Sequence, residues 1–277
     1  MQSPQYVHET HIMPDALMPF IFHTDKTSNK RIVPNWHENI ELLCFIEGEG
    51  NLKYGTERYP VRAGDVAVIN PDVLHMTESG GELIYHCLII DRAFCEANGI
   101  DVLSLHFKEI IADKELFSAF TDTVASIKAA RHEKAGICAV PEARHRVLGL
   151  LLHLCEKYVI SESKEKPANS ASAARIKTVM SYMRAHLAEP ITLDSVSDCV
   201  GVSKYHLSRE FKLYCGTTIF DSLNILRCKE ARHMLSAGAT VSEAAHACGF
   251  ENLSYFSRTF KKYTGKLPSE YAKEKAK

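Results

Sequence analysis

Short apolar runs, separated by glycine, asparagine and proline, follow one another between residues 31 and 90. The clearest runs are residues 41–46, 66–69 and 83–90, and Gly64 is one of the residues that separate them. Several short runs at close spacing, with turn residues between them, are typical of an all-β sandwich or barrel. The pattern therefore predicts a β-barrel in the N-terminal half of the chain.

After residue 105 the apolar positions recur with the period of an α-helix. A first stripe consists of Phe117, Phe120, Val124 and Ile127. A second stripe follows Pro141, a residue typical of a helix start, and consists of Leu148, Leu151, Leu152, Cys155 and Val159. The second stripe is narrow, so we expect it either to pack on the barrel of its own chain or to form a dimer interface.

A polar segment, residues 161–174, contains no large apolar residue and is rich in Ser, Lys and Glu. Such a composition is typical of a solvated linker. The prediction is a two-domain α+β protein: a β-barrel with flanking helices over residues 1–160, and an all-α domain over residues 175–277.

The all-α part contains an internal repeat. Residues 207–216 and 256–265 are identical at six of ten positions. Each copy follows a short apolar helix pattern and a glycine, Gly201 or Gly249. A short helix, a glycine turn and a second helix define a helix-turn-helix unit, so two units are predicted at residues 193–213 and 241–262, joined by a helix over about residues 218–236. Arg227, within the joining helix, is expected to pair with a carboxylate.

Polar, aromatic and basic side chains lie on the predicted second helices, away from the apolar pairs that face inward. In the first unit they are Lys204, Tyr205, Ser208, Arg209 and Lys212. In the second they are Ser254, Tyr255, Arg258, Lys261 and Lys262. The expected N-caps of the two helices are Ser203 and Asn252. Such groups suit phosphates and base edges, and their occurrence in both units favours DNA binding over a merely solvated face.

The net charge of the whole chain is −1, which points to no charged partner. Residues 168–277, however, hold 16 of the 33 Lys and Arg and 10 of the 34 Asp and Glu, which leaves 17 and 24 for residues 1–167. The two parts therefore carry +6 and −7, and the basic one fits a nucleic-acid partner.

Composition excludes several classes. Apolar residues at 45% and charged residues at 24% are ordinary for a globular protein, not for a disordered or collagen-like chain. No apolar run approaches the ~18 residues that span a bilayer, and no secretory signal is evident. Nine scattered cysteines without a C-x-x-C pair favour reduced thiols in the cytoplasm. Without an ATP- or dinucleotide-binding glycine motif, we expect neither an enzyme nor a cofactor.

The C-terminal residues resemble the AraC/XylS family of bacterial transcription regulators. The matching positions are Leu207–Gly216, Arg227, Ala231, Leu235, Gly249, Phe250, Tyr255–Arg258, Phe260, Lys261, Gly265, Pro268 and Tyr271. The resemblance spans about a hundred residues, and Ala272 departs from it where the family commonly has Arg.

The resemblance implies that the two second helices enter successive major grooves on one face of DNA, which repeat every ~34 Å. Bases would be contacted by Tyr205, Ser208 and Arg209 in the first unit and by Ser254, Arg258 and nearby Asn252 in the second; Arg258 could equally hold a phosphate. Thr217 and Thr218 would contact phosphate through helix N-terminal amides. The implied partners are promoter DNA, a small-molecule effector, RNA polymerase and a second copy of the chain, and the expected role is that of an activator.

The N-terminal half resembles the cupin barrels that sense effectors in this family. Residues 36–42 match the first cupin motif, and residues 64–71 followed by His75 match the second. Metal-binding cupins use three histidines and a glutamate, and here Asn35 occupies the first position, which leaves His37, Glu41 and His75. The resemblance favours effector contacts by Asn35, Trp36, His37, Glu41 and His75, or a plain structural role for the three polar ligand candidates, over a metal site.

Three functional hypotheses follow. The first is a DNA-binding regulator whose barrel senses a small molecule, with sugars favoured by analogy. The second is a cupin metalloenzyme with a DNA-binding tail, and the third a constitutive DNA-binding protein with a degenerate barrel. Tyr54, Tyr59, Tyr85 and Trp36 either line an effector pocket or belong to the core.

The divided charge leads to a first prediction. A fragment of residues 168–277 should bind DNA with an affinity that falls steeply as salt rises, because its basic groups displace cations condensed on the phosphates. Fluorescence anisotropy at several salt concentrations measures this slope, with a fragment of residues 1–160 as the control that does not bind. A salt-independent affinity would contradict the prediction.

Overall fold

The computed structural model describes residues 17–28, 34–161 and 171–275 of the chain. They form two compact units that meet in sequence near residue 170. This change of unit falls within the predicted linker, of which residues 162–170 lie outside the described residues. Residues 171–174 are helical rather than extended, because the first helix of the C-terminal unit already begins at Ala171. The two-domain α+β fold class is confirmed.

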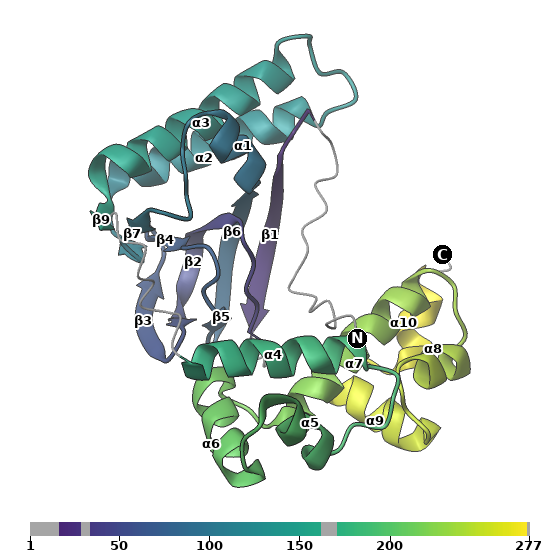
Figure 1. Cartoon of the computed structure of the whole chain (residues 1–277). Coiled ribbons are helices and arrows are strands. Elements are labelled where there is room, and N and C mark those ends of the chain that lie inside the picture. Colours follow the sequence, from purple (N-terminus) through teal and green to yellow (C-terminus); the bar gives the residue numbers. More distant parts are fainter. Residues whose placement is uncertain (1–16, 29–33, 162–170, 276–277) are drawn as a thin grey trace. The chain divides into compact units, whose positions relative to one another are not determined.

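The N-terminal unit is built on a seven-stranded antiparallel sheet (Figure 1). Its strands are β1 (Phe20–Ser28), β2 (Ile40–Tyr54), β3 (Glu57–Arg62), β4 (Val66–Ile69), β5 (His75–Glu78), β6 (Glu82–Ile90) and β8 (Ile110–Ile111). The order is β1-β6-β2-β4-β8, with β3 and β5 paired to the second half of β2. A bulge between Phe45 and Glu47 separates the two halves of β2, so the sheet folds over on itself. We call this folded sheet the barrel. A short pair, β7 (His106–Phe107) and β9 (Val159–Ser161), stands apart.

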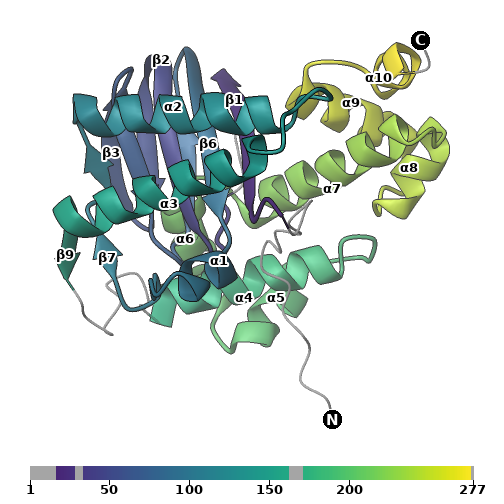
Figure 2. The ribbon, with the colours of Figure 1, turned by 90° about the horizontal axis from the view of Figure 1, so that it is seen from above.

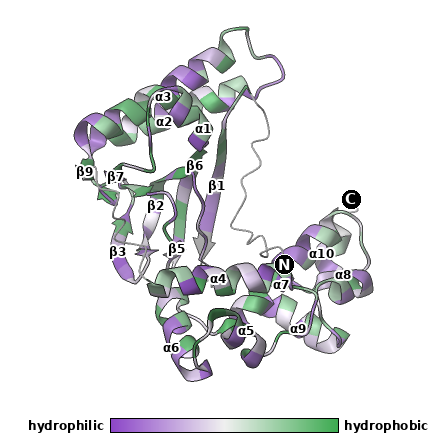
Figure 3. Ribbon diagram, viewed as in Figure 1, coloured by the Kyte–Doolittle hydropathy of each residue, from purple (hydrophilic) through white to green (hydrophobic). Residues whose placement is uncertain are grey.

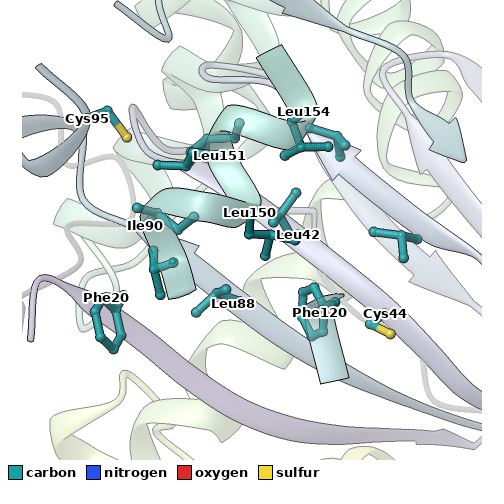
Figure 4. Close-up of a cluster of buried hydrophobic side chains, with 14 of the residues drawn as sticks. Phe20, Leu42, Cys44, Leu88, Ile90, Cys95, Phe120, Leu150, Leu151 and Leu154 are labelled. Carbon is teal, nitrogen blue, oxygen red and sulfur yellow. The ribbon is translucent and has the colours of Figure 1, made fainter. Parts of the chain in front are cut away.

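The two faces of the barrel have different cores. Successive residues of a strand point to opposite faces, so Leu42 and Cys44 face outward while Leu43 and Phe45 face inward. Helices α2 (Lys114–Ala130) and α3 (Ala139–Lys157) lie side by side across the outer face (Figures 1 and 2). Figure 4 shows the resulting cluster, in which side chains of the strands and of both helices meet; it includes Leu42, Leu88, Ile90, Phe120, Leu150, Leu151 and Leu154.

The second stripe of the sequence mostly packs on its own chain. Leu151 is fully buried, and Leu148 and Cys155 pack against the same outer core. Leu152 is 47% exposed, so its participation in a dimer interface stays a prediction. Hydrophobic and hydrophilic segments alternate along α2 and α3 (Figure 3), as expected for helices with one buried face. A one-and-a-half-turn helix, α1 (Arg92–Ala97), follows β6.

The C-terminal unit is all-helical within the described range. It consists of α4 (Ala171–Ala185), α5 (Leu193–Val200), α6 (Lys204–Cys215), α7 (Ile219–Ser236), α8 (Val241–Ala247), α9 (Leu253–Thr264) and α10 (Pro268–Lys275). The predicted helix-turn-helix units appear as α5–α6 and α8–α9. Capping boxes at Thr192 and Thr240 start the first helix of each unit, which satisfies amide groups that a helix leaves unpaired. Ser203 and Asn252 cap α6 and α9 as expected.

The partner predicted for Arg227 is wrong. Its Nε donates to the carbonyl oxygen of Leu187 and its Nη2 to that of Glu189, both at 2.8 Å, instead of to a carboxylate. These carbonyls follow the end of α4, where backbone acceptors lack helical partners, and a guanidinium supplies donors in a planar fork. Arg227 also lies over the ring of Phe250, 5.7 Å from its centroid. It therefore ties the end of α4 to the turn of the second helix-turn-helix unit.

The part of the chain that the structure describes contains no helix long and apolar enough to cross a membrane. Six of the nine cysteines are buried: Cys44, Cys87, Cys95, Cys215, Cys228 and Cys248.

The two turn glycines give a matched test of this tie. Both have positive φ, 65° at Gly201 and 75° at Gly249, but an added Cβ meets open space only at Gly201. At Gly249 it would lie 2.8 Å from Arg227 Nη2 and from the Leu187 carbonyl oxygen. Gly201→Ala should cost about 1 kcal/mol of unfolding free energy through backbone strain. Gly249→Ala should cost about 1–3 kcal/mol more, through overpacking. Urea denaturation followed by circular dichroism measures both, and equal costs would contradict the prediction.

Candidate nucleic-acid interface and barrel site

Helix α6 presents every polar residue that the sequence selected. Leu207 and Phe211 are fully buried and set the rotation of the helix. The opposite surface exposes the predicted contacts, Lys204, Tyr205, Ser208, Arg209 and Lys212. Tyr205 is 78% exposed, and an aromatic ring so far from the core is available to a partner. Lys204 also pairs with Asp194 of α5.

An ion pair between a half-buried arginine and a buried glutamate fixes α6 on α4. Glu210 accepts two hydrogen bonds from Arg175, from Nε at 3.0 Å and from Nη2 at 2.7 Å. The hydrogen bond from Arg175 is the main reason why the pKa of Glu210 is lowered. A two-pronged contact of this kind restricts rotation as well as distance. It therefore helps to hold the exposed face of α6 in one orientation.

Helix α9 repeats the arrangement. Phe256 and Phe260 are fully buried. The surface exposes the predicted contacts, Asn252, Ser254, Tyr255, Arg258, Lys261 and Lys262. Two of these have partners within the chain: Tyr255 Oη accepts from Asn224 at 3.0 Å, and Lys262 Nζ lies 3.3 Å from Asp221. Leu253, at the start of α9, is 43% exposed and is not among the predicted contacts.

The two threonines before α7 differ. Thr218 caps the helix, accepting from the amide of Asp221, and is exposed. Thr217 is 5% exposed, so its side chain is not presented to a phosphate. A phosphate contact from Thr217 would have to use the backbone, as the resemblance implies.

In the barrel, three of the selected residues form one buried cluster, which we call the His–Glu–His cluster: His37, Glu41 and His75. Their exposed fractions are 2%, 7% and 8%. Glu41 Oε2 lies 2.7 Å from His37 Nε2 and 3.1 Å from His75 Nε2. Glu41 comes from β2, His75 begins β5, and His37 lies in the segment before β2. Residues 38 positions apart in sequence are thus brought into contact.

Electrostatics in the cluster favours a charged glutamate. Burial alone would raise the pKa of Glu41, but the charge of His75 and hydrogen bonds to both histidines outweigh it, so the pKa lies well below its ordinary value. The second carboxylate oxygen, Oε1, accepts from Cys87 Sγ at 3.0 Å. Both oxygens of Glu41 are therefore engaged by side chains that line the barrel interior.

The remaining residues that the sequence selected in the barrel differ in how deeply they are buried. Asn35 is half-buried and exchanges two backbone hydrogen bonds with His75. Trp36, Tyr54 and Tyr85 are buried, and the hydroxyls of the two tyrosines are bonded to Asn70 and Thr77.

A separate hollow of about 630 Å³ opens on the barrel surface, and no member of the His–Glu–His cluster lines it. Its polar lining includes Asn51, Arg62 and Asp65. Strand pairing brings residue 51 of β2 close to β3, and the Arg62 amide donates to Asp65 Oδ2 at 3.0 Å, so residues separated in the sequence meet at this hollow.

Together, two similar exposed helices on an all-α unit and a β-barrel that encloses a buried polar cluster indicate a DNA-binding regulator with a ligand-binding domain. Sequence comparison agrees: residues 18–180 match the AraC-like ligand binding domain and residues 196–274 a helix-turn-helix domain of the AraC type. The chain belongs to the AraC/XylS family of transcription regulators.

The relatives match over different lengths. An uncharacterized HTH-type transcriptional regulator, YbfI of Bacillus subtilis (strain 168), is 28% identical over 80% of both chains. The xylose operon regulatory protein of Escherichia coli (strain K12) is 31% identical, but over 40% of this chain and 29% of its own length. An apo ToxT variant from Vibrio cholerae has the same fold, with a TM-score of 0.51, 14% identity, and coverage of 92% of this chain and 97% of its own.

Proposed function

We propose that this regulator is an activator that binds two successive major grooves of a promoter through α6 and α9, under the control of a sugar bound in the barrel. The observation that carries the DNA-binding mode is the pair of similar helices, each with a buried aromatic face and an exposed polar and basic face. Two such helices, joined by α7, supply base and phosphate contacts in duplicate.

The roles within the interface follow from exposure and chemistry. Arg209 and Arg258 are exposed and suit bidentate contacts with guanine or with phosphate. Lys204, Lys212, Lys261 and Lys262 suit phosphates, as do the amides at the start of α7. The other proposed DNA contacts are Tyr205, Ser208, Asn252, Ser254 and Tyr255. The hydroxyl and amide groups among them suit base edges.

The effector is proposed to contact Asn35, Trp36, His37, Glu41 and His75. Buried carboxylate and imidazole groups are the kind of polar anchor that orients a small hydroxylated ligand in a concave site. The similarity to the xylose operon regulatory protein supports a sugar. The proposed regulator acts in the cytoplasm, and its other partners are RNA polymerase and a second copy of this chain. In this proposal the chain regulates transcription and is not an enzyme.

DNA binding is tested by Arg209→Ala and Arg258→Ala in the full chain. Each should raise the Kd for the native promoter fragment about five- to 150-fold, because each removes a contact to a base or phosphate worth about 1–3 kcal/mol. Arg232→Ala, which removes an exposed arginine from α7 instead, is the control and should leave Kd within about twofold. Gel shift measures all three. Unchanged binding by both recognition-helix variants would disprove the assignment of α6 and α9.

Effector binding is tested by thermal shift with a panel of pentoses and hexoses. The bound sugar should raise the Tm of the wild type, because a ligand that binds only the folded state stabilises it by mass action. Glu41→Gln should abolish the shift, while Asn51→Ala, in the hollow, should retain it. The reverse pattern would move the effector to the hollow, and no shift with any sugar would contradict the sugar class.

A further inference from the structure

Two of the six basic side chains proposed to face DNA are already paired with aspartates of the chain itself. Lys204 Nζ of α6 contacts Asp194 Oδ1 of α5, and Lys262 Nζ of α9 lies 3.3 Å from Asp221 Oδ1 of α7. Both lysine side chains are more than half exposed, so both pairs lie at the surface. Exposed pairs contribute little to stability, so these two matter more for the charge of the surface than for the fold.

The internal repeat shows that each of these lysines belongs to one unit only. At the repeat offset of 49 residues, Lys204 corresponds to Leu253, and Lys262 corresponds to Leu213. The other four basic groups occupy equivalent positions in both units, and they are Arg209, Lys212, Arg258 and Lys261. Within the described part of the chain, none of these four forms an ion pair. The aspartates thus neutralise the two lysines that are particular to one unit and leave the shared cations free of carboxylates.

Both aspartates are fixed negative charges. Each lies in the first turn of its helix, where the helix dipole favours a carboxylate. Asp221 is held further: its Oδ2 accepts from Thr218 Oγ1 at 3.0 Å, and its Oδ1 accepts from Tyr263 Oη at 2.7 Å. The hydrogen bond from Tyr263 is the main reason why the pKa of Asp221 is lowered, so this carboxylate is charged at neutral pH.

A lysine paired in this way offers DNA no net charge. If it keeps its aspartate, it makes no phosphate contact; if it turns to a phosphate, it leaves a carboxylate beside the DNA, which repels it. We propose that Asp194 and Asp221 set the electrostatic part of the DNA affinity, each by cancelling one cation of the recognition surface. Because phosphate contacts are independent of sequence, base contacts then supply a larger share of the total affinity. The inference rests on the proposed function, since it requires α6 and α9 to face DNA.

The test uses Asp194→Asn and Asp221→Asn in the full chain. Asparagine keeps the size of the side chain and an acceptor oxygen for Thr218 and Tyr263, but removes the charge. Each variant should bind promoter and random-sequence duplexes more tightly, with the slope of log K against log salt steeper by about 0.9, and the double variant by about twice as much. Fluorescence anisotropy at several salt concentrations measures the slopes. Glu230→Gln, which removes a negative charge from another exposed position of α7, is the control and should leave the slope unchanged.

A charge-neutral replacement of each pair separates cancellation from a direct lysine contact. Lys204→Met added to Asp194→Asn should restore the wild-type slope, because the pair and its neutral replacement carry the same net charge; Lys262→Met added to Asp221→Asn should do the same. A slope shallower than that of the wild type would show that the lysine binds phosphate in spite of its aspartate, and would overturn the proposal.

Unchanged slopes in both aspartate variants, or an equal change in Glu230→Gln, would also overturn it. Circular dichroism shows whether each variant is folded, and if Asp221→Asn unfolds, Asp194→Asn decides alone. Failure of the proposed function is a distinct result: Arg209→Ala and Arg258→Ala would then bind DNA as well as the wild type.

Discussion

The N-terminal unit depends on one strand, β2, whose residues 40–45 are buried on both faces. Its fifteen residues pair with β3, β4, β5 and β6, so any change in its register would move every other part of the barrel. Because side chains alternate, a slip of one residue would turn Glu41 outward, into the core under α2 and α3, and turn Leu42 inward. Burial of the apolar side chains on the outer face therefore fixes the register of β2. That register in turn places Glu41 on the inner face.

The C-terminal unit relies on two arginines in a comparable way. Arg175 holds Glu210 of α6, and Arg227 holds the end of α4 while lying over Phe250. Both guanidiniums act inside the protein, in planar contacts that lysine could not reproduce. The arginines on the outer surfaces of α6 and α9 remain available to DNA. A net charge of +6 thus overstates the charge available to phosphates, since part of it stabilises the fold.

Most of the fold could be predicted from the sequence, because period and turn residues act locally. The glycine turns, the caps at Ser203 and Asn252 and the strands of the apolar runs all appear where their patterns indicated. What escaped prediction depends on distant partners. Arg227 was expected to meet a carboxylate because charge is visible in a sequence, whereas the backbone carbonyls that it binds are not.

The candidate site shows the same contrast between features that local patterns predict and features that depend on distant partners. The cupin motifs indicated His37, Glu41 and His75, but not that both Nδ1 atoms face carbonyls or that Cys87 reaches Glu41. The hollow could not be predicted because its lining comes from separate segments, and the exposure of Leu253 could not because an apolar residue in a helix is usually buried. On the DNA-binding surface, exposure could be predicted residue by residue, since helical period determines it. The engagement of Tyr255 and Lys262 by α7 could not, because it arises from the packing of α9 on α7.

Control of DNA binding by an effector requires energetic coupling between the two units. A ligand in the barrel alters DNA binding only if its affinity differs between the states that bind DNA well and poorly, and by linkage DNA then alters the ligand's affinity by the same factor. The barrel interior is suited to this because Glu41 and His75 lie on different strands, while His37 lies outside the sheet. A group bound to all three joins β2, β5 and the segment before β2, so it favours whichever state keeps them together. An effector at the proposed site would therefore control DNA binding through how firmly these three segments are joined.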